Sequence, residues 1–136
     1  MKIVMLSGKT NCGKSTTLNL VYDYIHQKEG DIIEAKMVLG NPKYRDFECI
    51  IQYRDKTIAF YTMGDYSYCL LDAFEKYYTK CDYLICACNT RFVKPYKRIC
   101  DFEHIIIDKS IAISLTQADC GVANSLDKEK IMKEIE

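Results

Sequence analysis

A short glycine-framed segment near the N-terminus carries the residues best suited to chemistry. The segment Gly8–Ser15 reads G-K-T-N-C-G-K-S. Glycine lets the backbone curl closely around a ligand, so that successive amide N–H groups point into one concavity. The lysine at position 14 adds a mobile cation, and the serine adds a hydroxyl oxygen of the kind that Mg²⁺ binds. The spacing therefore predicts a site for an anionic ligand.

The residues on either side have the pattern needed to position this segment. The run Lys2–Leu6 is apolar on both faces and predicts a buried parallel strand. Ser15–Gln27 follows the segment and predicts an amphipathic helix. Its apolar face carries Leu18, Val21, Tyr22 and Ile25. A strand, loop and helix in this order place the loop amides at a helix N-terminus, where the helix dipole favours an anion.

The combination resembles the Walker A motif of the P-loop NTPase superfamily. The resemblance implies a nucleoside triphosphate with Mg²⁺, with ATP the default and GTP the alternative. Lys14 would contact the β- and γ-phosphates, Ser15 would bind Mg²⁺, and Thr16 would lie near the α-phosphate. The predicted nucleotide-binding residues are Gly8, Lys9, Thr10, Asn11, Cys12, Gly13, Lys14, Ser15, Thr16 and Gly64. The alternative is a glycine-containing turn that binds nothing.

The remaining chain alternates between strand and helix patterns. Further strands are predicted at Ile32–Leu39, Phe47–Tyr53, Thr57–Tyr61, Tyr83–Cys88, Ile105–Ile107 and Ile111–Leu115. Further helices are predicted at Ser67–Tyr78 and from Ser125, with Asn124 or Ser125 as the cap. Phe47–Tyr53 and Thr57–Tyr61 form a hairpin around the residues at 54–56. The pattern predicts one domain, residues 1–136, folded as a three-layer α/β/α sandwich with a mostly parallel central sheet.

The turn Thr62-Met63-Gly64-Asp65 follows an apolar strand and is a second candidate for the site. It resembles the D-x-x-G turn of GTPases, with the aspartate replaced by Thr62. Gly64 would offer its N–H to the γ-phosphate, and Asp65 would hold Mg²⁺ or orient the attacking water. The alternative is that Asp65 caps the following helix. The missing strand-end aspartate argues against fast hydrolysis.

A basic segment follows the strand Tyr83–Cys88. Its cations are Arg91, Lys94, Lys97 and Arg98, with Phe92 and Tyr96 between them. Arg91 lies nearest to the end of the strand and is the candidate to stabilise charge on a transferring phosphoryl group. The segment loosely resembles the lid of small-molecule kinases. The alternative is a solvated basic loop.

Three further segments carry weaker signals. Thr116–Asp119 resembles the guanine-reading element of GTPases with its lysine replaced by Gln117, and Asp108-Lys109 is a poorer match. Lys9 occupies the position at which dimeric ATPases of the superfamily carry a lysine donated between subunits, and the alternative is an exposed loop lysine. Gly40–Asp46 is either a switch-like loop facing the substrate or an exposed connector.

The composition of the chain limits the kinds of binding partner that we expect. Nineteen basic and nineteen acidic residues give zero net charge, so no global field attracts nucleic acid or anionic lipid. No stretch approaches the roughly 20 apolar residues of a membrane span, and no signal peptide pattern is present. A cytoplasmic protein is expected, with a nucleotide and either a protein partner or a second copy as partners.

The eight cysteines are then free thiols, and the alternative is a zinc site. Its ligands would be Cys86, Cys88, Cys100 and His104.

Three functions are consistent with these residues. The first is a switch or partner-driven NTPase, in which Lys14, Asp65 and Arg91 are the catalytic residues. The second is a small-molecule kinase that uses ATP. The third is a nucleotide-binding module with little catalysis.

Overall fold

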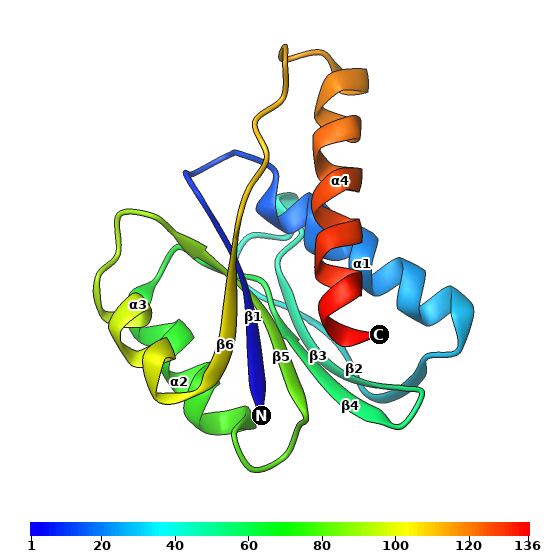
Figure 1. Ribbon diagram of the computed structural model, residues 1–136, viewed down its shortest axis with the longest axis vertical. Helices are drawn as coiled ribbons and strands as arrows, with labels where there is room; N and C mark the ends of the chain where they lie inside the picture. Colours follow the sequence, from blue (N-terminus) through cyan, green and yellow to red (C-terminus); the bar gives the residue numbers. More distant parts are fainter.

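One six-stranded sheet organises the computed structural model, which describes residues 1–136 (Figure 1). The strands are β1 (Lys2–Gly8), β2 (Asp31–Val38), β3 (Phe47–Tyr53), β4 (Lys56–Tyr61), β5 (Tyr83–Asn89) and β6 (Glu103–Asp108). The helices are α1 (Lys14–Lys28), α2 (Ser67–Tyr77), α3 (Lys94–Arg98) and α4 (Gln117–Ile135), with short 3₁₀ turns η1 (Pro42–Tyr44) and η2 (Ile99–Asp101). No helix is long and apolar enough to cross a bilayer.

The sheet is mixed, in the order β2-β3-β4-β5-β1-β6. Strands β4, β5, β1 and β6 are parallel, whereas β3 pairs antiparallel with β4 and β2 pairs antiparallel with β3. The expectation of a mostly parallel sheet therefore holds for four strands and is wrong for the other two. The reason is the predicted hairpin, which is confirmed: Arg54 adopts a φ of 54° in its tight turn and reverses the chain between β3 and β4.

Helices cover both faces of the sheet. Helices α1 and α4 lie on one side, and α2 and α3 lie on the other (Figure 1). Strand β1 is fully buried between them, with Val4 and Leu6 in the cluster under α1 and α4. Ile3 and Met5 belong to the cluster under α2. Each buried aliphatic side chain stabilises the fold by about 1.5–3 kcal/mol, so the end of β1 is held firmly in place.

The prediction of a strand at Ile111–Leu115 is wrong. This segment is a loop in which Ile111, Ile113 and Leu115 are 94%, 97% and 98% exposed. Strand β6 is the edge of the sheet, and no neighbouring strand accepts the alternating apolar side chains. The helix cap was also misplaced: α4 begins at Gln117, where the Thr116 hydroxyl accepts the Asp119 amide N–H, so Asn124 and Ser125 lie inside the helix.

A buried ion pair attaches α4 to the end of β6. Lys109 Nζ lies 2.8 Å from Asp127 Oδ2, and the two side chains are 2% and 0% exposed. The Ser110 amide and hydroxyl also donate to Asp127. Burial alone raises the pKa of Asp127, but the hydrogen bonds from Lys109 and Ser110 outweigh it and hold that pKa below its usual value. The carboxylate is therefore charged and fully paired.

We expect Asp127→Asn to lower the free energy of unfolding by about 3–5 kcal/mol, because it leaves the Lys109 ammonium buried without a counter-charge. Urea unfolding at neutral pH measures this loss. Glu129→Gln, on the exposed side of the same helix, is the control and should change stability by less than about 0.5 kcal/mol. An equal loss of stability in both variants would contradict the assignment of Lys109 and Asp127 as a buried, stabilising ion pair.

The same pair sets an acid limit on stability. Because the pKa of Asp127 is lower in the folded protein than in the unfolded chain, its stabilisation is complete above about pH 4. It is lost as the pH falls below that value. The free energy of unfolding, measured at a series of acid pH values, should show this loss in the wild type. It should fall less steeply with pH in Asp127→Asn.

Candidate functional site

The loop between β1 and α1 presents amide N–H groups that have no acceptor. No backbone amide from Lys9 to Gly13 donates a hydrogen bond within the chain. Helix α1 has no side-chain cap, so its first three amides, at residues 14–16, are unsatisfied as well. Gly13 at a φ of 95° and Asn11 at a φ of 59° turn the backbone into this concave form. Such a cradle of N–H groups at a helix N-terminus binds anions.

Lys14 places a cation beside these amides. Its side chain is 8% exposed, and Nζ donates to the carbonyl oxygens of Gly8 at 3.0 Å and Lys9 at 2.6 Å. Both partners are neutral, and no carboxylate lies within ion-pair distance of the ammonium group. The charge of Lys14 is therefore available to an anion in the loop.

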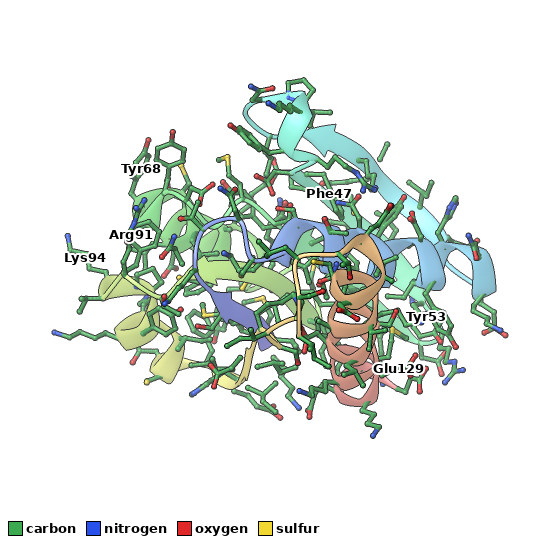
Figure 2. The ribbon with its side chains drawn as sticks, turned by 90° about the horizontal axis from the view of Figure 1, so that it is seen from above. Phe47, Tyr53, Tyr68, Arg91, Lys94 and Glu129 are labelled. Atoms are coloured by element: carbon green, nitrogen blue, oxygen red, sulfur yellow. The ribbon has the colours of Figure 1, made fainter.

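A cavity of about 510 Å³ lies in front of the loop. Its walls are residues 10–16, residues 43–46, and the turn containing Thr62, Gly64 and Asp65. Of the two alternatives for the segment Gly40–Asp46, a loop facing the site or an exposed connector, the structure favours the first, because residues 43–46 line this cavity. Figure 2 looks down on this edge of the sheet, where β1 runs into the loop and α1.

Asp46 lines this cavity as well, although the sequence analysis named it only as the last residue of the segment Gly40–Asp46. Its side chain is 6% exposed, and Oδ1 accepts hydrogen bonds from Ser15 Oγ at 2.5 Å and Thr62 Oγ1 at 3.0 Å. Burial raises the pKa of Asp46 above its usual value, whereas the hydrogen bonds from the two hydroxyls lower it, and the nearby Asp65 raises it. The Thr62 hydroxyl in turn accepts the Phe47 amide.

Gly64 and Asp65 lie where the sequence placed them, at the wall of the cavity. A side chain at Gly64 would come within 2.7 Å of the Ala87 carbonyl oxygen, so only glycine allows this close approach to β5. Asp65 is exposed, and α2 begins after Tyr66 without a side-chain cap. Asp65 is therefore not the cap of α2, and its carboxylate faces the cavity.

Arg91 does not line this cavity. It is exposed, lies outside the cavity wall, and stacks on Phe92 with 5.2 Å between its guanidinium carbon and the ring centre. Figure 2 shows Arg91 and Lys94 on the same side of the molecule as Tyr68. Arg98 forms ion pairs with Glu75 and Asp101 instead. The basic segment is thus divided between solvent and the surface of α2.

Asn89, rather than Arg91, connects β5 to the loop. Its side-chain Nδ2 donates to the Thr10 hydroxyl at 2.7 Å, and its side-chain Oδ1 accepts the Arg91 amide N–H. A second cavity of about 420 Å³ begins beyond it. That cavity is lined by Ser7, Thr90, Phe92, Val93, Tyr96 and Lys97.

Helix α4 supports the loop from behind. Thr17 Oγ1 donates to the Gly13 carbonyl at 2.8 Å and lies 3.2 Å from Asn124 Oδ1. Sequence reasoning placed Asn124 at the cap of the final helix and so did not connect it with the loop. Asp119, which the sequence analysis considered as a base-reading residue, accepts a hydrogen bond from the Ser114 hydroxyl at the start of α4.

The alternative zinc site is not formed. No three side chains of His, Cys, Asp or Glu gather in a metal-binding arrangement. Cys86 and Cys88 are fully buried in β5, and burial raises the pKa of Cys88 to about 11. Both thiols are therefore protonated core residues.

Comparisons with family models, with curated proteins and with solved structures gave no match to this chain.

We expect Gly64→Ala to lower the free energy of unfolding by about 1–3 kcal/mol, because the added methyl group meets the backbone of Ala87 and Cys88. Gly121→Ala is the matched control, since the space around Gly121 on α4 is open. It should stabilise the protein by up to about 1 kcal/mol through helix propensity. Chemical denaturation of both variants tests this, and equal effects would refute the close contact at β5.

Proposed function

We propose that the chain is a P-loop protein that binds a nucleoside triphosphate, ATP before GTP, and hydrolyses its γ-phosphate as a switch or partner-driven NTPase. The observation that carries the proposal is the set of unsatisfied amides around Gly8–Ser15, combined with an uncompensated Lys14 in the same cavity. A polyphosphate supplies the acceptors and the negative charge that this arrangement lacks.

The phosphates would replace the present partners of Lys14. The ammonium group would exchange the carbonyls of Gly8 and Lys9 for the β- and γ-oxygens, while the loop amides bind the remaining oxygens. Thr16 is exposed at the wall of the cavity, as a contact near the α-phosphate requires. The binding energy would come from charge-assisted hydrogen bonds made by a preorganised backbone.

The oxygen donors at the cavity fit Mg²⁺. Hydroxyl and carboxylate oxygens from Ser15, Asp46 and Asp65 face one space, and Mg²⁺ prefers such hard ligands. Bound magnesium would neutralise charge on the β- and γ-phosphates. Ser15 is the ligand implied by the resemblance to the superfamily.

Hydrolysis would transfer the γ-phosphoryl group to water, breaking the bond to the β-phosphate oxygen and releasing the diphosphate and inorganic phosphate. Asp65 is the exposed carboxylate at the cavity and is suited to orient that water. Thr62 occupies the strand end at which related turns carry aspartate. We therefore expect slow turnover by the isolated protein, and faster turnover when a partner completes the site.

A small-molecule kinase is the second candidate, and the second cavity favours it. This space lies next to the phosphate loop and includes Lys97 of the basic segment. An acceptor bound there would receive the γ-phosphoryl group in place of water. A kinase would release little phosphate until its acceptor is added.

We expect ATP, or else GTP, to raise the melting temperature of the wild type, because a ligand of the folded state stabilises it by RT ln(1 + [L]/Kd). Thermal shift with each nucleotide, with Mg²⁺ and with EDTA, measures this. Lys14→Ala should abolish the shift, because it removes the cation of the loop. Lys133→Ala, an exposed lysine of α4, should leave it unchanged.

Phosphate release on the same samples separates the functions. Turnover without an acceptor supports the NTPase, and binding without turnover supports a kinase or a binding module. A wild type that shows no shift with either nucleotide, or a Lys14→Ala variant that keeps it, refutes the nucleotide site.

A further inference from the structure

The segment between β2 and β3 supplies a carboxylate to the phosphate loop. We propose that Asp46, and not Asp65, is the carboxylate that holds the magnesium ion of the bound nucleotide, directly or through the water shell of the ion, together with Ser15. The inference rests on the proposed nucleotide site and adds to it a metal-positioning residue from the segment Gly40–Asp46, which the sequence pattern marked only as a loop.

The contact between Asp46 and Ser15 is the first observation. Ser15 follows directly after Lys14, and its hydroxyl oxygen already touches Asp46 Oδ1 in the protein without ligands. An ion bound by a lone pair of Ser15 Oγ leaves the hydroxyl proton free to donate to Asp46. Asp65 lines the same cavity but makes no hydrogen bond, so nothing holds its carboxylate toward Ser15.

The charge of Asp46 is the second observation. The residue is 6% exposed, and the hydrogen-bond partners of its carboxylate are two neutral hydroxyl groups. No lysine or arginine lies within ion-pair distance of it. The charge of Lys14 acts on the carboxylate only from farther away. Burying a carboxylate without a direct ion-pair partner is costly, and a nearby divalent cation compensates that cost. Asp46 is in this respect unlike Asp127, which is buried with its lysine.

Three elements position the carboxylate. Hairpin pairing brings Phe47 opposite Thr62, so that Thr62 reaches Asp46 from the end of β4. Asn19 of α1 donates to the Arg45 carbonyl and holds the preceding residue against the helix. The residue after β4 is thus Thr62 and not an aspartate. Thr62 instead orients the carboxylate of Asp46, which directly precedes the neighbouring strand β3.

The test measures nucleotide affinity by isothermal titration calorimetry, in EDTA and in Mg²⁺, for wild type, Asp46→Asn and Asp65→Asn. The nucleotide is whichever of ATP and GTP stabilises the wild type. Asparagine at position 46 keeps an oxygen that accepts from both hydroxyls, so the loop should stay folded, and the melting temperature without ligand checks this.

We expect Mg²⁺ to tighten binding to the wild type and to Asp65→Asn. In Asp46→Asn this gain should shrink by about 10-fold or more, as for other groups that hold a metal or its ligands. In EDTA, Asp46→Asn should bind at least as tightly as the wild type, because a carboxylate that repels phosphate has been removed.

The other outcomes of the titrations distinguish failure of the nucleotide site from failure of the role of Asp46. A wild type that binds no nucleotide overturns the proposed function. A wild type that binds nucleotide without any gain from Mg²⁺ overturns the role of Asp46 but leaves the phosphate site intact. A gain kept in Asp46→Asn, or lost in Asp65→Asn, also overturns that role, and makes Asp46 a structural partner of Ser15.

Discussion

Helix α1 begins without a cap, and the rest of the site depends on that start. Gly13 takes a left-handed conformation directly before Lys14, so no side chain covers the first amides of the helix. Unsatisfied donors near the surface are costly unless water or a ligand meets them. These donors and the buried Lys14 beside them suit the proposed binding of an anion, because the protein itself supplies no acceptor for the amides.

Such a loop needs rigid neighbours, because its own amides make no internal bonds. Strand β1 fixes one end through complete burial, and Asn89 of β5 holds the Thr10 hydroxyl. Helix α4 closes the back through Asn124, and the ion pair of Lys109 with Asp127 keeps that helix in place. The proposed anion site is therefore supported by β1, by β5 and by the last helix of the chain.

The hairpin connects this frame to the candidate metal ligands. Pairing of β3 with β4 sets the residue before β3 beside the residue after β4, which brings Asp46 to Thr62. The sequence predicted both strands and their turn, so the register alone contained this contact. What it lacked was the approach of the hairpin to α1, which places Asp46 on Ser15.

Local pattern determined the glycine-framed loop between β1 and α1, the hairpin and most strands and helices, because apolar periodicity and glycine spacing act between residues close in the chain. It misjudged Ile111–Leu115, since an alternating pattern makes a strand only where a neighbour pairs with it. It also favoured Arg91, although β5 presents Asn89 to the loop. Tertiary structure alone decided which polar side chains meet, because Asp46, Asn89 and Asn124 reach the loop from distant elements whose packing no short-range pattern encodes.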